Sequence, residues 1–194
     1  ERLLALTLII LLSPIFFVAA IFVFFTSRGP IFYKSLRVGR NMENFYCIKF
    51  RTMKTQVTGS LITVDGDARI TFVGKVLRQT KIDELPQLWN VVLGEMRFVG
   101  SRPEDVNYVS RDNPKQREVL NSPPGITGPA SIYYRAEEKI LANAIKNGEE
   151  PGEAYARIAA HKTDLDLDYL RSRDWKSDFG LILRTIGALV SPKV

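Results

Sequence analysis

The feature that most constrains this chain is an almost unbroken apolar run over residues 3–25, near the start of its 194 residues. A helix rises about 1.5 Å per residue, so a run of this length reaches across a hydrocarbon core of about 30 Å. The run is too long for a signal peptide and lacks a small-residue cleavage site before the basic region that follows. We therefore expect a membrane helix over residues 1–27, followed by one integrated domain over residues 28–194.

Ser13 and Pro14 interrupt the apolar run at its centre. Proline removes a backbone donor and clashes with the carbonyl four residues earlier, so a helix kinks or breaks there. Two structures satisfy this pattern: a kinked span, or a re-entrant helix that dips into the bilayer and returns to the same face. Every Lys and Arg except Arg2 follows the run, which predicts a cytoplasmic location for the larger part. Charge counting does not decide between the two structures.

The composition limits the kinds of partner and the kinds of site that this chain can have. A net charge of +6 suits partners that carry phosphate, such as nucleic acid, anionic lipid or a phosphorylated small molecule. Nucleic acid is not expected, because the aromatic residues concentrate in the apolar run instead of alternating with a basic stripe. Cys47 is the only cysteine, which excludes an intrachain disulfide. His161 is the only histidine and is expected on the surface, so neither a Cys/His zinc site nor a Ser-His-Asp triad is supported.

The periodicity after the apolar run predicts an α+β fold that is mainly α, with a small β element. Short strands are expected over residues 31–34 and 45–53, and a loop over residues 55–67. Helices are expected over residues 71–78, 83–93, 105–120, 136–146, 152–171 and 175–190. The last of these is amphipathic, as in helices that lie in a membrane interface.

Asp83 and Glu84 are adjacent carboxylates at the expected start of a helix. A helix N-terminus favours negative charge, and Thr80 with Asp83 could form a capping pair, so a structural role would explain them. A catalytic role is also open, because an ionised carboxylate can attack phosphorus without an activating base. Its neighbour could help to hold Mg²⁺, which takes oxygen ligands and shares them with substrate phosphates.

Residues 100–103, Gly-Ser-Arg-Pro, form a candidate phosphate-binding loop. Glycine permits a close approach of the backbone, and Arg102 could hold a phosphate with two donors. Lys49, Arg51 and Arg78 could supply the further positive charge that a diphosphate needs. Lys49 and Arg51 share one face of the expected strand, and a solvated surface explains that pattern equally well.

Other acidic residues have simpler explanations. Asp65-Gly66-Asp67 resembles the acidic pair with which many nucleotide-sugar glycosyltransferases hold a metal, but it equally fits a turn. Asp166 and Asp178 fall in expected helices, where they would ordinarily be solvated charges. A Walker loop and a G-x-G-x-x-G fingerprint are missing from the sequence, so neither type of nucleotide site is supported.

Short blocks of unusual sequence follow one another along the chain. They are Ser13-Pro14 and residues 49–53, 69–71, 74–78, 83–87, 90–91, 94–96, 99–103 and 124–128. Together and in this order, the blocks closely resemble the bacterial sugar transferase family, the monotopic phosphoglycosyl transferases. The resemblance extends over about residues 3–190.

The resemblance assigns roles that the residues alone leave open. It implies that the break at Ser13 and Pro14 makes a re-entrant helix. It implies that Asp83 is the nucleophile and that Glu84 supports metal binding and proton handling. Arg102 would bind phosphate. The late acidic positions Asp166 and Asp178 match positions of functional weight in the family.

The resemblance also implies a reaction and its partners. Asp83 would attack a UDP-sugar, releasing UMP and holding a phosphosugar on its carboxylate. A polyprenyl phosphate, expected to be undecaprenyl phosphate, would then take the phosphosugar and leave as polyprenyl-diphospho-sugar. We expect Mg²⁺ as the cofactor, membrane phospholipid as a partner, and the cytoplasmic face of the bacterial inner membrane as the location. The product would initiate glycoconjugate assembly, exopolysaccharide among others, and a homodimer is compatible with the pattern.

The chain departs from the family in three places. Ser101 stands where the family usually has proline, the Asp that often follows the first Arg-Leu is missing after Arg2, and residues 136–162 are longer than in the smallest members. Two alternatives stay open. One is a metal-dependent glycosyltransferase that uses Asp65 and Asp67, and the other is a membrane-anchored basic scaffold without catalysis. The sugar is not predicted.

Overall fold

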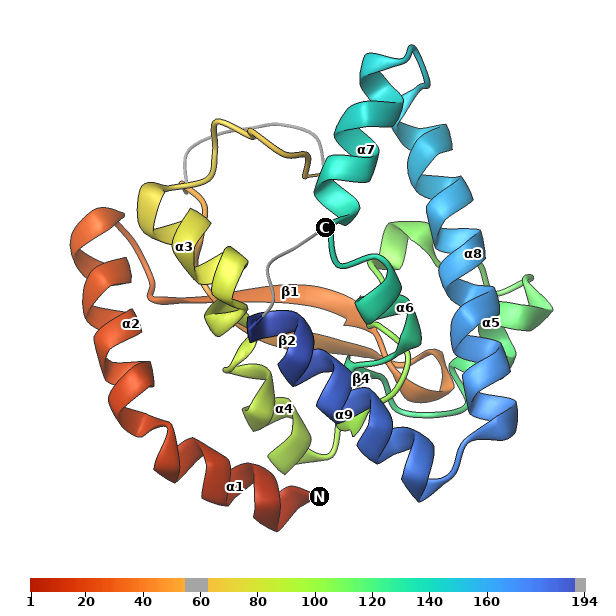
Figure 1. Ribbon diagram of the computed structural model, residues 1–194, viewed down its shortest axis with the longest axis horizontal. Helices are drawn as coiled ribbons and strands as arrows, with labels where there is room; N and C mark the ends of the chain where they lie inside the picture. Colours follow the sequence, from red (N-terminus) through yellow and green to blue (C-terminus); the bar gives the residue numbers. More distant parts are fainter. Residues whose placement is uncertain (55–62, 191–194) are drawn as a thin grey trace.

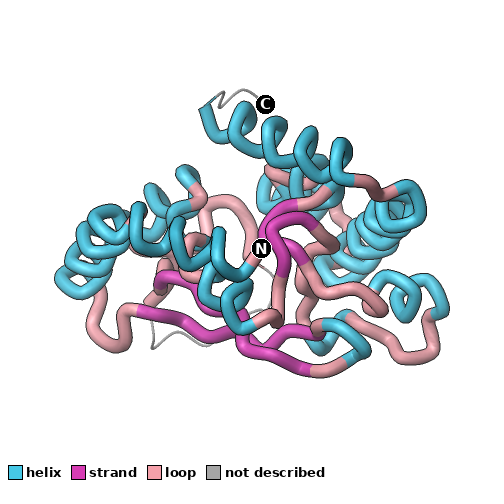
Figure 2. The backbone as a smooth tube through the Cα atoms, turned by 90° about the horizontal axis from the view of Figure 1, so that it is seen from below, coloured by secondary structure: helices cyan, strands magenta, loops and turns pink. Residues whose placement is uncertain are grey.

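The computed structural model describes residues 1–54 and 63–190, without the side chains of residues 189 and 190. The described part is mainly helical with a small β component, as the sequence predicts, and helices lie on both sides of the strands (Figure 2). β1 (Phe32–Val38) and β2 (Asn44–Phe50) form an antiparallel hairpin, and β3 (Arg97–Val99) pairs in parallel with β4 (Gly125–Thr127). The helices are α1 (Arg2–Leu11), α2 (Ser13–Thr26), α3 (Phe72–Thr80), α4 (Gln87–Leu93), α5 (Pro114–Val119), α6 (Pro129–Tyr133), α7 (Glu137–Lys146), α8 (Pro151–Ser172) and α9 (Trp175–Val190).

Two expected helices differ in the structure. The helix expected from Asp83 starts only at Gln87, because residues Ile82–Glu84 form a separate 3-10 turn. The Thr80 hydroxyl donates to the Val76 carbonyl at 2.9 Å, so the expected capping pair with Asp83 was wrong. The helix expected over residues 105–120 was also wrong.

Proline explains the second difference. Residues 105–120 contain a 3-10 turn, Val106–Tyr108, and the short α5, which begins at Pro114. Proline disfavours a helical conformation in the preceding residue, and Asn113 is accordingly extended. The Asn113 side chain instead caps α5 by accepting from the backbone N–H of Lys115 at 3.0 Å.

The two strands of the hairpin also have different bounds from those expected. β1 continues to Val38, and β2 ends at Phe50. Of the loop expected over residues 55–67, residues 55–62 lie outside the described residues. The remainder contains a turn at Asp65-Gly66, where Gly66 takes a φ of 82°.

The apolar N-terminal segment forms two helices, α1 and α2, that meet at Leu12 with a bend of 64°. In the described part of the chain, no single helix is long and apolar enough to cross a membrane, whereas this bent pair passes the same test of length and composition. The pair lies along one edge of the molecule, opposite α8 (Figure 1). Many of its large side chains face outward: Leu3 is 82 % exposed and Phe25 is 79 % exposed.

A narrow stripe of the bent pair packs against the rest of the fold. Ala5 of α1 is fully buried beside Leu88 and Val91 of α4, and Ala19 and Val23 of α2 pack with residues of α3 and β2. Small and β-branched residues allow close approach of these helices. The bent pair therefore packs in two hydrophobic clusters, one with α4 and β2 and the other with α3 and β2.

Asn90 ties α4 to the open edge of β2. Its side-chain oxygen accepts from the Ile48 backbone N–H at 3.1 Å, and its amide nitrogen donates to the Tyr46 carbonyl at 2.8 Å. The carboxamide thus satisfies backbone groups that a third strand would otherwise pair with. Asn90 has no exposed surface, so removing it would leave these groups buried without partners.

Gly74 allows α3 to pack directly on the chain that follows β2. A Cβ at this position would lie 2.0 Å from the Thr52 carbonyl oxygen. The backbone N–H of Thr71 donates to the same oxygen at 3.0 Å. Since α3 leads into the turn that carries Asp83 and Glu84, this contact sets that turn beside β2.

Candidate active site

The adjacent carboxylates Asp83 and Glu84, termed the dyad below, lie on the 3-10 turn between α3 and α4. Lys81 ends α3 in the left-handed conformation, with φ of 58°, which reverses the chain just before the turn. A non-glycine residue in this conformation is uncommon and carries some backbone strain. The tight geometry brings both carboxylates against β2.

Asp83 is buried but incompletely paired. Asp83 is 7 % exposed, and its Oδ1 atom has no hydrogen-bond partner among the described residues. A buried carboxylate oxygen without a partner is costly in a purely structural role. Asp83 is therefore poorly explained as a simple helix-start residue, the structural alternative that the sequence leaves open.

Glu84 has the opposite environment. Its Oε1 atom accepts from Lys49 Nζ at 3.0 Å and lies 3.5 Å from Nη2 of Arg102. Lys49 comes from β2 and Arg102 from the loop after β3, so three separate segments meet at one carboxylate.

The different environments separate the two acids. Burial and the neighbouring Glu84 charge raise the pKa of Asp83 to about 6. For Glu84, burial alone would raise the pKa, but Lys49, Arg102 and Lys81 outweigh it and hold the pKa below its usual range. Glu84 therefore stays ionised at neutral pH, whereas Asp83 loses its proton at a pH slightly below neutral.

The loop of residues 100–103, termed the phosphate loop below, is built by close backbone packing. The Gly100 N–H donates to the Thr127 carbonyl at 2.9 Å, and the Gly125 N–H donates to the Ser101 carbonyl at 2.8 Å. A Cβ on Gly125 would lie 2.1 Å from the Gly100 nitrogen. The two glycine-containing blocks, residues 99–103 and 124–128, thus support one another.

Asp166 of α8 fixes this loop from behind. Its Oδ2 accepts from the Arg102 backbone N–H and its Oδ1 from the Ala130 N–H, both at 3.3 Å. Burial raises the pKa of Asp166 to about 7, against the two backbone donors that lower it. Asp166 touches the backbone of Arg102, so it acts on the loop's position.

A buried ionic network extends from the same loop to α7 and α8. Lys162 is 3 % exposed and lies 2.7 Å from Glu137 and 3.4 Å from Glu104. The Tyr155 hydroxyl donates to Glu104 at 2.7 Å. The longer segment over residues 136–162 is in this way connected to the residues next to Arg102.

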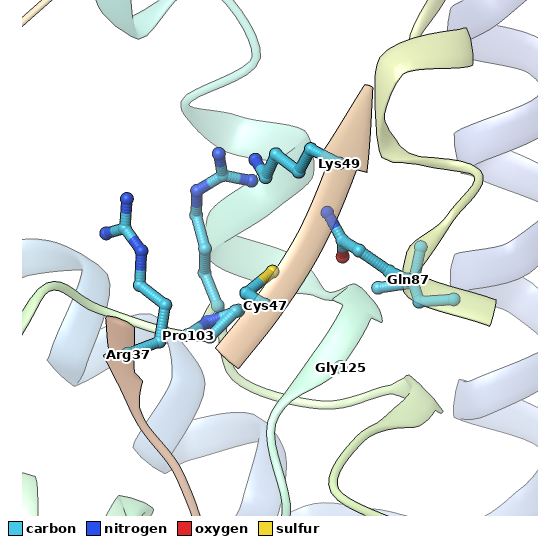
Figure 3. Close-up of a pocket in the computed structure, with 8 residues that line it drawn as sticks. Arg37, Cys47, Lys49, Gln87, Pro103 and Gly125 are labelled. Carbon is cyan, nitrogen blue, oxygen red and sulfur yellow. The ribbon is translucent and has the colours of Figure 1, made fainter. Parts of the chain in front are cut away.

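A small pocket lies beside the dyad, between β1, β2, α4 and the phosphate loop (Figure 3). Three cations, a buried thiol and a buried amide line it together with the loop proline: Arg37, Lys49, Arg102, Cys47, Gln87 and Pro103. Burial raises the pKa of the Cys47 thiol, so it adds no negative charge. The pocket has the electrostatics of an anion-binding site.

Three of the expected site residues make other contacts. The Arg51 guanidinium donates to the Ser27 carbonyl at 2.7 Å and to the Ser27 hydroxyl at 2.9 Å, so it holds the end of α2. Arg78 donates to Thr52 Oγ1 and pairs with Glu138, but its charge still lowers the pKa of Asp83.

Asp178, the third of them, lies on the first turn of α9. It pairs with Arg173 at 2.8 Å and accepts from the Tyr169 hydroxyl. The structure shows no contact between it and the dyad or Arg102 within the described ranges 1–54 and 63–190.

The alternative metal pair has a different explanation. Asp67 forms an ion pair with Arg69 at 2.6 Å, and its backbone N–H donates to the Val64 carbonyl, which closes the turn. This geometry supports the turn interpretation of Asp65-Gly66-Asp67. His161 is exposed, as predicted, and its Nδ1 lies 2.6 Å from the Tyr134 hydroxyl.

The dyad offers carboxylate oxygens, which are the kind of ligand that Mg²⁺ takes. Among the described residues, His, Cys, Asp and Glu nowhere form a group of three or more that could hold a metal by themselves. Asp83 offers one unpartnered oxygen, and Glu84 is already paired with cations. This donor set fits Mg²⁺ only if substrate phosphate oxygens and water complete the coordination, as Mg²⁺ commonly requires.

Sequence reasoning missed Arg37, Lys81 and Gln87. Arg37 lies on β1 and reaches the site only through the pairing of β1 with β2, which a single sequence does not reveal. Lys81 is adjacent to the dyad in sequence, and Gln87 lies within the block of residues 83–87, so proximity to Asp83 was an available signal for both.

The chain matches the profile described as bacterial sugar transferase over residues 1–192. The UDP-glucose:undecaprenyl-phosphate glucose-1-phosphate transferase of Caulobacter vibrioides is 33 % identical over 187 residues, covering 93 % of this chain and 64 % of that protein. The exopolysaccharide production protein PSS of Rhizobium leguminosarum bv. phaseoli is 31 % identical over 191 residues, covering 94 % of this chain and 88 % of that protein. The galactosyl transferase CpsE of Streptococcus agalactiae is 38 % identical over 171 residues, covering 81 % of this chain.

The chain spans only 34 % of the length of CpsE, so several relatives are much longer proteins. The family match over residues 1–192 takes in the apolar segment, the dyad, the phosphate loop and the late helices. By a match that extends over nearly its whole length, the chain belongs to the bacterial sugar transferase family.

Proposed function

We propose that this chain is a phosphoglycosyl transferase that moves a sugar-1-phosphate from a UDP-sugar to undecaprenyl phosphate through a covalent intermediate on Asp83. The observation that carries the proposal is the buried dyad, in which Asp83 has a free oxygen while Glu84 is held by Lys49 and Arg102. The names of relatives that act on undecaprenyl phosphate support the substrate class. Those relatives include a glucose-1-phosphate transferase and a galactosyl transferase, so the sugar stays open.

In the first step, Asp83 attacks the sugar-bearing phosphorus of the donor. A bond forms between an Asp83 oxygen and phosphorus, the bond to the bridging oxygen breaks, and its electron pair leaves with UMP. An anion attacking an anion is opposed by charge repulsion, which Lys49 and Arg102 reduce at the point of attack. Asp83 and Glu84 would hold Mg²⁺, which would supply further countercharge.

In the second step, an oxygen of the lipid phosphate attacks the same phosphorus. The bond to Asp83 breaks, the carboxylate is regenerated, and polyprenyl-diphospho-sugar leaves. No proton has to be removed from either nucleophile, because a carboxylate and a phosphate are both ionised at neutral pH. The charges of Lys49 and Arg78 favour the ionised form of Asp83, and Lys49 and Arg102 keep Glu84 in place.

The proposed location is the cytoplasmic face of the bacterial inner membrane, with α1 and α2 re-entering the bilayer from that side. Large apolar side chains are exposed on α1 and α2 and also on α4 and α9, where Trp89 is 47 % and Trp175 is 74 % exposed. Such surfaces suit phospholipid acyl chains and the interface above them. This depth lets a lipid phosphate and a soluble nucleotide reach one site.

Contacts of the first residues support a re-entrant path over a kinked span. Glu1 pairs with Arg97 of β3 at 3.2 Å, and the Arg2 guanidinium lies against Gly94, at the end of α4. Both partners belong to the part that carries the dyad. Contact of Glu1 and Arg2 with this part supports a return of the chain to the side that carries the dyad. The homodimer stays a prediction from the sequence.

Replacing Asp83 with Asn should lower UMP release on the order of 10³-fold or more, because an amide is a poor nucleophile toward phosphorus. The assay supplies a panel of UDP-sugars with Mg²⁺ and undecaprenyl phosphate. Asp67→Asn is the matched control and should keep activity, since Asp67 pairs with Arg69 away from the dyad. Loss in Asp67→Asn with retention in Asp83→Asn, or release of UDP in place of UMP, would favour the metal-dependent glycosyltransferase instead.

The pH profile of kcat/KM for the UDP-sugar should rise through about pH 6 and level off above it, because Asp83 must be ionised to attack and its pKa is about 6. The Lys49 charge lowers that pKa, so Lys49→Met should move the rising limb to higher pH. Lys146→Met, at the exposed end of α7, should leave the limb in place. A limb that stays fixed, or moves to lower pH, in Lys49→Met would contradict Asp83 as the titrating nucleophile.

A cysteine at residue 1 should be protected from a membrane-impermeant thiol reagent added outside intact cells, and should react in inverted membrane vesicles. The variant is Glu1→Cys with Cys47→Ser, and Arg111→Cys in the same background reports the exposed catalytic part. Equal behaviour of the two cysteines is the expected result. Labelling of residue 1 from outside would establish a span and overturn the re-entrant path.

A further inference from the structure

Two residues of the pocket beside the dyad, Arg37 and Gln87, have no role in the two proposed reaction steps. Figure 3 shows them on opposite sides of Cys47, with Gln87 reaching toward the strand that carries Cys47 and Lys49. Lys49 contacts Glu84, so the pocket adjoins the dyad. Arg37 makes no ion pair with either carboxylate of the dyad in the part of the chain that the structure describes.

Arg37 is held in place by two neighbours. Its Nε donates to the Ser35 hydroxyl at 3.2 Å, and its Nη1 forms a long ion pair with Asp105 at 3.7 Å. The side chain is 26 % exposed and lines the pocket. A guanidinium held in this way can turn its other donors to an oxyanion with little loss of conformational entropy.

Gln87 is the second pocket residue without a role in the proposed chemistry. The residue is 3 % exposed and lines the pocket. A glutamine amide offers two N–H donors, which the oxygens of a bound anion can accept. The amide faces the pocket, where a bound anion would satisfy its N–H donors.

The cations of the pocket lie in two places, as the two phosphates of a diphosphate would require. Lys49 and Arg102 belong to the dyad end, because both approach Glu84, and Arg37 lines the same pocket from β1. A donor with its sugar-bearing phosphate at Asp83 has one adjacent phosphate, joined through the bridging oxygen. That second phosphate gains negative charge when the bond breaks and UMP leaves.

We propose that this pocket binds the nucleoside-side phosphate of the donor, with Arg37 and Gln87 as its specific ligands and Lys49 and Arg102 shared between the two phosphates. Arg37 stabilises the charge that develops on the departing nucleoside monophosphate. The inference rests on the proposed function, since it takes Asp83 as the point of attack. It fixes the orientation of the donor in the site.

Direct binding of UMP to the full chain in detergent micelles, at one fixed Mg²⁺ concentration, tests this assignment. Arg37→Gln should weaken UMP binding by about 10-fold or more, because a charge-assisted contact is lost, and Gln87→Met by about 3- to 10-fold. Arg37→Lys keeps the positive charge but loses the paired N–H donors of the guanidinium. Its affinity for UMP should fall between those of wild type and Arg37→Gln. Arg40→Gln, an exposed arginine three positions further on, is the control and should bind UMP as wild type does.

Steady-state kinetics separate the two phosphate sources. The KM for the UDP-sugar should rise in Arg37→Gln, while the KM for undecaprenyl phosphate stays within about twofold. UMP binding equal to that of Arg40→Gln in both Arg37→Gln and Gln87→Met, in protein with unchanged thermal unfolding, overturns the assignment. A rise confined to the KM for undecaprenyl phosphate also overturns it, because the pocket would then hold the acceptor.

The proposed function can fail separately from this inference. If Asp83→Asn releases UMP as fast as wild type, the nucleophile is wrong, whatever the binding data show. If wild type needs Asp83 for release but Arg37→Gln binds UMP normally, the nucleophile stands and the pocket assignment fails.

Discussion

The ion pairs of Glu84 hold together the parts of the site that come from different regions of the chain. Lys49 arrives on β2, Arg102 on the loop after β3, and Glu84 on the turn between α3 and α4. These contacts are largely shielded from water, where an ion pair is strong only if its geometry is good and both charges are satisfied. The close backbone packing at Gly74 and Gly125 supplies that geometry, and α1 and α2 pack against β2 and its neighbouring helices.

The dyad works because its two acids are not equivalent. Glu84 takes up the positive charge of its neighbours and stays ionised, while Asp83 keeps an unpartnered oxygen and a raised pKa. A carboxylate that is buried and unpaired is a better nucleophile than one already held by cations, because it has fewer stabilising contacts to give up. The same asymmetry supports the proposed roles, which are attack by Asp83 and anchoring by Glu84.

The sequence predicted the parts of this site that lie in contiguous blocks. The break at Ser13 and Pro14, the dyad, Arg102 and the late helices could all be read in order along the chain. The packing of residues that are far apart in the sequence could not be predicted in this way. Period-two alternation put Lys49 and Arg51 on one face, but β2 ends at Phe50, so Arg51 turns to Ser27 instead. Arg37 reaches the pocket only through the hairpin, and the helix expected over residues 105–120 was wrong because Pro114 keeps Asn113 extended and starts a separate helix.

The central claim is a covalent phosphosugar on Asp83, and a single-turnover experiment tests it most directly. The purified chain is mixed with the preferred UDP-sugar and Mg²⁺ without any lipid acceptor, quenched in acid, and analysed for UMP and by peptide mass spectrometry. The account predicts a burst of about one UMP per protein chain and a sugar-phosphate mass on the peptide that contains Asp83, which hydroxylamine removes and added undecaprenyl phosphate discharges. UMP release that requires the acceptor from the first turnover, with no modified Asp83 peptide, would show direct transfer and contradict the account.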